Sequence, residues 1–426
     1  MIFSALKNGI WDKALEETES SRDEASFDLE LSRFRAAKHA TKGLPDDEGR
    51  YTCFSQAFRQ MHNKPPQLLR KSVRLYRTIL AGEKAIDAGG PYRESFGMYC
   101  QELQSPVLSL LLPTPNGRHS IGQNRDQWVL NPGARSSLLR EMFVFLGRLM
   151  GVAIRGKEYL TLSLPPIIWK SIVGENLTRE DLEAVDQFLV ISLDKLRDID
   201  KEGIDASNFN DVFFETFTTV STDNRVVELI PNGAAVPVLY DNRTEYCDLV
   251  IEYRLREFEE QVKAVREGLR MIVPFQLVSL YSWDQFERMV CGVPMVDIGL
   301  LRSVTEYSSC SSSDQHISFF WRCLEDFSLE ERQAFLRFTW GRSRLPMNAA
   351  SFSQNFKIQS FQKSPADSYF PLAHTCFFSI ELPAYSSLEI MKAKLHYAIF
   401  NCQAIDGDDT NVAMAVDDLD WDDSPI

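Results

Sequence analysis

The segment Leu372-Ala373-His374-Thr375-Cys376-Phe377-Phe378-Ser379-Ile380-Glu381-Leu382-Pro383 lies near the end of the 426-residue chain. From Phe378 onward, apolar residues alternate with polar ones, and this period of two predicts a strand with one buried face. Strict alternation would place Cys376 on the buried face, where free cysteines are common. If the strand begins after Cys376, the thiol lies in a loop and can react, and His374 would favour its thiolate.

The composition is that of an ordinary folded protein. Hydrophobic residues make up 44% of the chain and charged residues 25%, which is usual for globular domains, and the length predicts two or three domains. No apolar run approaches the roughly 18 residues that span a bilayer, and the N-terminus lacks the pattern of a secretory signal. We therefore expect no membrane span.

The net charge of −14 is concentrated in residues 401–426, which contain eight aspartates and no lysine or arginine. This acidic tail is predicted to be unstructured. The rest of the chain is close to charge balance, so a basic face for nucleic acid is not expected.

The eight cysteines are scattered and form no C-x-x-C pair. This spacing argues against a zinc site and a disulfide framework, and we predict neither a metal nor a cofactor. Unpaired cysteines are typical of reducing compartments, so we expect the protein in the cytoplasm or the nucleus.

Three separated motifs resemble those of one enzyme family. The Cys376 segment, continued by Leu382-Pro383-x-Tyr385, resembles the active-site signature of HECT-type ubiquitin ligases. Upstream, FTWGRSRLP at 338–346 resembles a second segment of that family, F-(V/T)-(T/S)-G-x-x-R-x-P. Trp340 departs from the family pattern, which usually has Thr or Ser there. GEKAIDAGGPYRE at 82–94 resembles the opening of the family's N-terminal lobe, so we interpret Asp87, Arg93 and Glu94 as structural. The residues at the variable positions of these motifs are most similar to those of the large HERC ligases.

The resemblance covers about residues 51–400 and implies an α+β fold with two lobes. The larger N-terminal lobe would be mostly helical, the smaller C-terminal lobe α/β, and a hinge would join them. The predicted domains are a helical N-terminal extension (1–50), the N-terminal lobe (51–292) with an E2-binding subdomain at about 176–250, the hinge (293–296), the C-terminal lobe (297–400) and the acidic tail (401–426).

The resemblance also implies a reaction. Cys376 would accept ubiquitin from a ubiquitin-conjugating enzyme (E2) as a thioester and pass it to a substrate lysine. His374 and Thr375 would support the loop around the thiol. The implied partners are therefore a ubiquitin-charged E2, ubiquitin and protein substrates.

Residues 176–250 are rich in apolar side chains. Those at 182, 185, 189, 193 and 196 predict one continuous helical face, and Val226–Ile230 with Val236–Leu239 predicts a hairpin. The ordinary interpretation of such residues is core packing. The resemblance implies instead that some of them form an exposed groove for E2, as a small subdomain can present. These residues are Leu189, Leu193, Leu196, Phe213, Tyr246 and Val250.

Two other functions stay open. A catalytically weak HECT-like module could bind E2 or ubiquitin as a scaffold, because the family's apolar terminus does not follow the last predicted helix. A cysteine hydrolase is less compatible, since such enzymes bring a His and an Asn or Asp to the thiol from elsewhere. Here only His374 has a motif context, two residues from Cys376.

Overall fold

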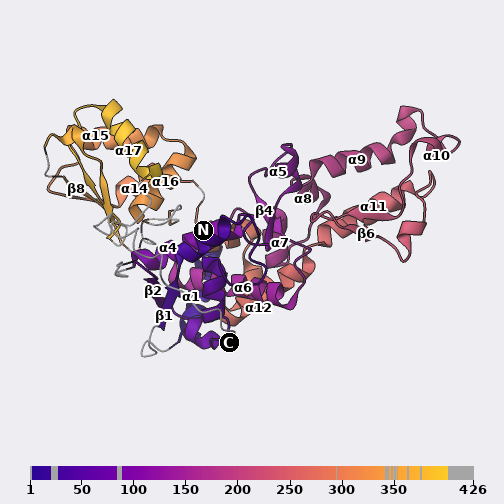
Figure 1. Cartoon of the computed structure of the whole chain (residues 1–426), viewed down its shortest axis with the longest axis horizontal. Coiled ribbons are helices and arrows are strands. Elements are labelled where there is room, and N and C mark those ends of the chain that lie inside the picture. The colour runs from indigo at the N-terminus through magenta and orange to yellow at the C-terminus, as the bar shows by residue number, and fades with distance from the viewer. Residues whose placement is uncertain are drawn as a thin grey trace.

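The computed structural model describes residues 2–20, 27–83, 89–293, 295–340, 345–346, 349, 352, 354–361, 364–374 and 377–401, without the side chains of residues 2–5 and 401. These residues form an α+β protein in which long helices surround four small sheets. Figure 1 shows three groups of elements: a central body, an arm at the upper right, and a C-terminal group at the upper left. Each group has an apolar core of its own.

Two helices, α6 (Ser137–Gly156) and α12 (Glu259–Ile272), cross at the centre of the body. Their backbones approach so closely that a Cβ atom on Gly268 would lie 1.9 Å from the carbonyl oxygen of Val144. A Cβ atom on Gly147 would lie 2.0 Å from the carbonyl oxygen of Val265. Side chains at 147 and 268 are therefore excluded, and this contact joins distant parts of the chain into one core.

The remaining elements of the central body pack around this helix pair. They include a two-stranded antiparallel sheet formed by β3 and β4. These elements are α2 (Arg33–Ala40), α3 (Cys53–Met61), η1 (Pro66–Leu69), α4 (Gly90–Leu103), β3 (Leu111–Pro113), α5 (Pro115–His119), β4 (Trp128–Leu130), α7 (Pro166–Val173), α8 (Arg179–Glu183), η4 (Phe275–Leu280) and α13 (Trp283–Cys291).

The N-terminal segment packs directly on this body. Helix α1 (Ile2–Glu17) places Trp11 edge-on against Tyr281, with 5.4 Å between ring centroids. Arg155 of α6 donates hydrogen bonds to the carbonyl oxygen of Leu15 (2.8 Å) and to Oγ1 of Thr18 (2.5 Å). The end of α1 is thereby fixed to the central helix pair.

Residues Phe27–Leu31 form a strand, β1, and the prediction of a purely helical extension is wrong here. This strand pairs in parallel with β2 (Tyr76–Leu80). Leu29 and Leu31 are fully buried while Glu30 between them is exposed. This period of two is the signature of a strand, and pairing with β2 fixes it.

The arm begins where the predicted continuous helix of residues 182–196 is interrupted. The chain instead forms α8 and then α9 (Gln187–Arg197). Asp186 caps the new helix, since its side chain accepts a hydrogen bond from the backbone N–H of Leu189 (3.2 Å). Leu182 is buried in the central core and Leu193 in the core of the arm. The apolar stripe therefore serves two cores.

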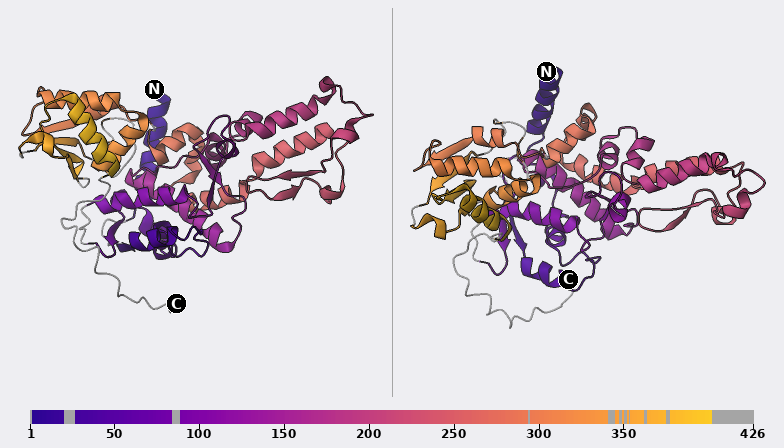
Figure 2. Two further views of the ribbon diagram at one scale, coloured as in Figure 1. Left: turned by 45° about the horizontal axis from the view of Figure 1, so that its top comes forward. Right: turned by 90° about the horizontal axis from the view of Figure 1, so that it is seen from above.

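The predicted hairpin of the arm is also wrong. Strand β6 (Val226–Glu228) pairs antiparallel with the preceding β5 (Thr218–Val220). The segment expected to pair with it contributes only an isolated bridge between Thr216 and Pro237. The arm is completed by η2 (Ile199–Glu202), α10 (Phe209–Val212), η3 (Gly233–Ala235) and α11 (Arg243–Arg256), and projects from the body in both views of Figure 2.

A buried ionic network fixes the base of the arm. Arg254 of α11 forms ion pairs with Asp186 (2.9 Å) and Glu257 (3.0 Å). Glu257 also accepts hydrogen bonds from the backbone N–H (2.9 Å) and the hydroxyl (2.6 Å) of Thr222. Removing one member would leave a buried charge without its partner, which is strongly destabilising.

The C-terminal group contains a four-stranded mixed sheet in the order β7-β8-β10-β9. Strand β8 is parallel to both of its neighbours, whereas β9 and β10 are antiparallel. The last buried residue of the central core is Cys291, and the core of the C-terminal group begins at Val296. The elements are α14 (Ile298–Ser303), β7 (Thr305–Ser308), α15 (Gln315–Asp326), α16 (Leu329–Trp340), β8 (Phe356–Ser360), η6 (Ala366–Ser368), β9 (Leu372–His374), β10 (Ser379–Leu382) and α17 (Leu388–Asn401).

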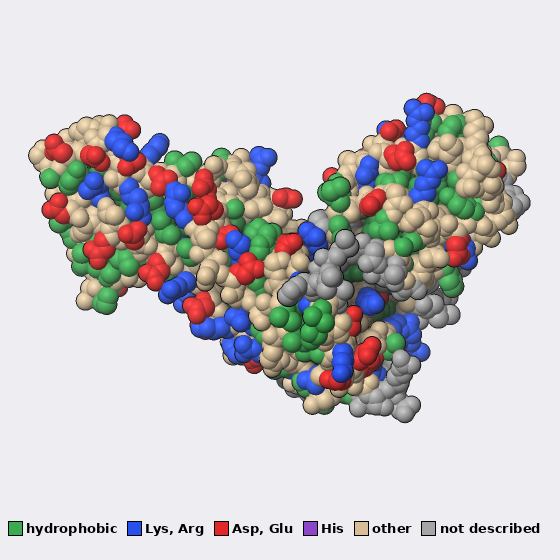
Figure 3. Space-filling model, turned by 180° about the vertical axis from the view of Figure 1, so that it is seen from behind, with side chains coloured by type: hydrophobic (Ala, Val, Ile, Leu, Met, Phe, Trp, Pro, Cys, Tyr) green, Lys and Arg blue, Asp and Glu red, His purple; other side chains and the backbone are tan. Residues whose placement is uncertain are grey.

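The arm and the C-terminal group stand apart on the central body. In the space-filling view of Figure 3 an open hollow separates them. None of the helices in the described ranges is both long and apolar enough to cross a membrane.

Candidate active-site loop and partner surface

The hairpin of β9 and β10 carries the segment with which the sequence analysis began. Its register pairs His374 with Ser379 and Ala373 with Ile380. Cys376 and Thr375 lie outside the described residues. The predicted strand is confirmed: it begins at Ser379, after Cys376, and Ile380 is fully buried. The interpretation of a reactive thiol requires a strand that begins after Cys376.

The chain directly before β10 is held in a rare backbone conformation. Phe377 is 68% exposed, whereas Phe378 is fully buried and has a φ of +45°. A bulky residue rarely adopts this left-handed region unless its surroundings enforce it. The ring of Phe378 stacks on Trp340, and its carbonyl oxygen accepts a hydrogen bond from the N–H of Lys357 in β8 (2.9 Å). Both contacts fix the chain two residues after Cys376.

Trp340 also links the loop to the central body. Its ring lies between Phe378 and Phe352, with centroids 4.0 Å and 5.6 Å away. The side-chain amide of Gln354 lies 3.1 Å from the indole Nε1 atom of Trp340 and 3.2 Å from Nη1 of Arg93 in α4, and because both of these neighbours are donors, the amide oxygen is assigned to face them. The carboxamide of Gln354 is oriented by these two donors. Arg93 was predicted to be structural, and its position across from Gln354 was not foreseen.

His374 is oriented by a carboxylate on the neighbouring strand. Its Nε2 atom lies 3.0 Å from Oε1 of Glu381, at hydrogen-bonding distance. Both side chains are partly exposed. This contact fixes the imidazole at the end of β9, two residues before Cys376 in the sequence, which is compatible with the predicted supporting role.

Most other thiols of the chain are in unreactive environments. Of the six cysteines within the described ranges, five are buried and Cys310 is half-buried, and none of them forms a disulfide. Burial raises the pKa of Cys247 to about 11 and that of Cys323 to about 12. Burial also raises the pKa of Cys53 and of Cys310. Because the thiolate is the nucleophile, these four thiols are poor candidates at neutral pH.

Among the described side chains, no group of three His, Cys, Asp or Glu residues could hold a metal ion.

The predicted E2-binding residues lie mostly inside the arm. Leu193, Leu196, Tyr246 and Val250 are buried around Phe209 and Cys247, and Leu189 and Phe213 are half-buried. The ordinary interpretation, core packing, therefore holds for the four buried residues Leu193, Leu196, Tyr246 and Val250. They form the interior that shapes the arm, and direct contact of their side chains with a partner is not supported.

The exposed apolar side chains of the arm are different residues, which the sequence analysis did not select. Phe214 is 80% exposed, and Phe188 and Ile191 of α9 are also exposed. Phe188 and Ile191 are three residues apart and lie outside the stripe of Leu189, Leu193 and Leu196. The sequence did contain a signal for these exposed residues. Residues three apart share a face of a helix, so Phe188 and Ile191 predict a second apolar face on α9.

The comparisons with known proteins identify one family. The sequence model of the HECT-domain (ubiquitin-transferase) family matches residues 98–406. The E3 ubiquitin-protein ligase HERC2 of Homo sapiens is 40% identical over 386 residues, which are 89% of this chain and 8% of that protein. The probable E3 ubiquitin-protein ligase HECTD4 of Homo sapiens is 31% identical over 81% of this chain and 10% of that protein. The E3 ubiquitin-protein ligase HUWE1 of Mus musculus is 31% identical over 82% of this chain and 8% of that protein.

The predicted likeness to HERC ligases is thus confirmed, and this chain spans a tenth or less of the length of these relatives. Relatives that are at least 30% identical cover more than two thirds of this chain. The family model also covers most of the chain. The chain belongs to the HECT-domain (ubiquitin-transferase) family.

Proposed function

We propose that this chain is the catalytic part of an E3 ubiquitin ligase, with Cys376 as the residue that carries ubiquitin. Membership of the HECT-domain family is the observation that carries the proposal. The hairpin geometry supports it, because β10 begins only after Cys376. The environments of Cys53, Cys247, Cys310 and Cys323 support it as well, because burial disfavours their thiolates. The names of the relatives give no support to the scaffold alternative.

The reaction would have two steps in which one acyl group moves twice. First, the thiolate of Cys376 attacks the thioester carbonyl between ubiquitin and E2; a new C–S bond forms and the E2 cysteine leaves as thiolate. Second, the amine of a substrate lysine attacks the new thioester; a C–N bond forms, the thiolate of Cys376 leaves, and the nitrogen loses a proton. Neither step requires ATP or a cofactor.

We propose that E2 docks on the arm. The exposed apolar side chains Phe188, Ile191 and Phe214 would supply its contact surface, and the buried residues of the arm would hold that surface in shape. The hollow of Figure 3 separates the arm from the C-terminal group, to which the β9–β10 hairpin belongs. A movement at the predicted hinge, 293–296, would have to bring the reacting atoms to about 3–3.5 Å. Ubiquitin, protein substrates and a location in the cytoplasm or nucleus belong to the same proposal.

The test is a single-turnover reaction of the full chain with activating enzyme, a panel of E2 enzymes, ATP and ubiquitin. Non-reducing gels should show a ubiquitin adduct that thiol removes and that Cys376→Ala abolishes. Cys402→Ala and Cys310→Ala are matched controls and should keep the adduct. An adduct that survives in Cys376→Ala would overturn the assignment of the acceptor. A folded protein that forms no adduct with any E2 would favour the scaffold function.

A further inference from the structure

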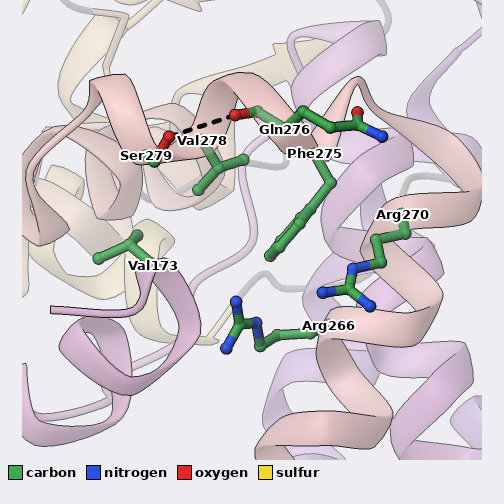
Figure 4. Close-up of a pocket in the computed structure, with 7 residues that line it drawn as sticks. All are labelled: Val173, Arg266, Arg270, Phe275, Gln276, Val278 and Ser279. Atoms are coloured by element: carbon green, nitrogen blue, oxygen red, sulfur yellow. Dashed lines mark hydrogen bonds between the residues drawn. The ribbon is translucent and has the colours of Figure 1, made fainter.

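A cavity of about 420 Å³ opens on the central body where α7, α12 and η4 meet. Figure 4 shows its lining, in which two guanidinium groups and the ring of Phe275 face the same space as two valines. The lining residues are Val173, Arg266, Arg270, Phe275, Gln276, Val278 and Ser279. The cavity therefore combines a cationic side with an apolar one.

The two arginines are held together by helix spacing and by one aromatic ring. Arg266 and Arg270 are four residues apart on α12, so their side chains share one face of the helix. Their Cζ atoms lie 5.4 Å and 5.2 Å from the ring centroid of Phe275. Such distances are those of cation–π contacts. Phe275 thus acts as a common support for both guanidinium groups.

Within the described part of the chain, this positive charge has no acidic partner. Neither arginine forms an ion pair with a described carboxylate, unlike the nearby Arg140, which pairs with Glu267 (2.5 Å). The Nε atom of Arg266 is buried and makes no hydrogen bond to a described residue. Burial, and next the like charge of Arg270, lower the pKa of Arg266. Two adjacent like charges are unfavourable, and one anion bound between them would relieve this repulsion.

We propose that this cavity binds a phosphate monoester, with the phosphate between Arg266 and Arg270 and the organic part against Val173, Val278 and Phe275. The charge decides for phosphate over carboxylate. A phosphate monoester carries about −1.5 to −2 at neutral pH and can neutralise two guanidinium groups, whereas one carboxylate neutralises only one. The planar fork of donors on each arginine matches phosphate oxygens in a two-point contact.

The site is remote in the sequence from the β9–β10 hairpin and consists of residues of the central body. The proposal therefore does not depend on ligase activity and can be tested by binding alone. The same chemistry could come from a phosphorylated side chain of another protein or from a small phosphorylated metabolite.

The experiment is a calorimetric titration of the full chain with phenyl phosphate, with benzoate as the carboxylate of the same ring and with inorganic phosphate. We expect phenyl phosphate to bind most tightly. Arg266→Gln and Arg270→Gln should each weaken it roughly tenfold or more, because each removes charge-assisted hydrogen bonds. Arg140→Gln removes the same charge from the surface of the same body and should leave binding unchanged. Thermal unfolding of each variant verifies the fold, and Arg270 is exposed enough to be replaced safely.

The outcomes separate the possibilities. Equal binding of benzoate and phenyl phosphate, equal weakening by Arg140→Gln, or no saturable binding in the millimolar range would each overturn the proposal. If phenyl phosphate binds as expected, a phosphotyrosine peptide and a sugar phosphate are titrated next. Tighter binding of the peptide would identify a protein source, and tighter binding of the sugar phosphate a metabolite source.

Discussion

Trp340 and Phe378 stack almost in parallel, with ring centroids 4.0 Å apart and 8° between the ring planes. Trp340 ends α16, and Phe378 directly precedes β10. The stack therefore ties the exit of the Cys376 loop to a helix of the same core. Trp340 departs from the usual family pattern, and its extra ring area is what makes this contact.

Replacing Trp340 with alanine should destabilise the C-terminal group. The side chain is fully buried, and loss of such an aromatic ring lowers the free energy of unfolding by about 3–5 kcal/mol. Trp340→Phe keeps a ring on Phe378 but loses the N–H to Gln354, so its loss should be smaller. Urea unfolding measures both, and single-turnover gels report whether thioester formation on Cys376 slows in the same order. An alanine variant with the stability of the original protein would contradict the role of the stack.

Gln354 should restrain the C-terminal group against the central body. Its side-chain oxygen faces both Trp340 of the C-terminal group and Arg93 of the central body. Gln354→Ala removes this shared acceptor, so the distribution of distances between the arm and the C-terminal group should broaden. Energy transfer between dyes placed on α9 and α15 measures this distribution. Gln359→Ala, in strand β8, is the matched control, and equal broadening in both variants would sink the idea.

A pair of substitutions in the arm separates its surface from its core. Phe214→Ala should leave stability within about 0.5 kcal/mol, because the side chain is largely exposed and surface changes have small effects. It should nevertheless slow transfer from E2 if this surface is the docking site. Leu193→Ala should lower the free energy of unfolding by about 2–5 kcal/mol, because the leucine is buried.

Unfolding curves and E2 titrations of both variants check this pair. Saturating E2 should restore the rate of Phe214→Ala, since only docking is weakened. A Phe214→Ala variant with an unchanged rate at limiting E2 would exclude this residue from the docking surface.

The crossing of α6 and α12 should not tolerate a side chain at Gly268. A Cβ atom there would overlap the carbonyl oxygen of Val144, so the helices must move apart. Gly268→Ala should lower the free energy of unfolding by about 1–3 kcal/mol or more, as overpacking does. Gly9→Ala is the control, because nothing lies within 4 Å of its added Cβ. In helix α1 that change should stabilise by about 0.5–1 kcal/mol, and thermal unfolding of both variants measures the opposite signs.

Glu102 should make stability depend on pH. Burial raises the pKa of its carboxyl from 4.5 to about 7, against hydrogen bonds from the backbone N–H groups of Phe54 (2.7 Å) and Cys53 (2.8 Å). The folded protein therefore binds this proton more tightly than the unfolded chain. The resulting stabilisation is complete below pH 4.5 and is lost as the pH rises through 7. A shift of this size corresponds to about 3 kcal/mol.

Glu102→Gln cannot titrate and should lack this contribution. As the pH rises from below 4.5 to above 7, the original protein should lose up to about 3 kcal/mol of unfolding free energy that the variant does not lose. Urea unfolding of both proteins across the range measures the difference. If the unfolding free energies of the two proteins change with pH in parallel, Glu102 does not titrate in this pH range.

The local sequence was sufficient for elements whose pattern and core agree. The strand after Cys376 follows from one periodicity that a single core satisfies. Prediction failed where one stripe serves two cores, as at Asp186, and where a period of two was assigned to a helix, as at Phe27–Leu31. The prediction of the hairpin in the arm was wrong because Thr218–Val220, the strand before β6, was not recognised as the partner of β6.

The sequence by itself determined the family, the class of fold and the cysteine on which the proposed chemistry rests, because short motifs and periodicities are local properties of the chain. Only the tertiary structure decided which apolar residues of the arm are buried and which are exposed, since burial depends on what the other elements cover. It alone brought Arg93, Gln354, Trp340 and Phe378 into one connected set. It likewise placed two arginines and Phe275 around a cavity. Contacts between residues far apart in the chain carry no periodic signal, because they arise only when separate elements pack against one another.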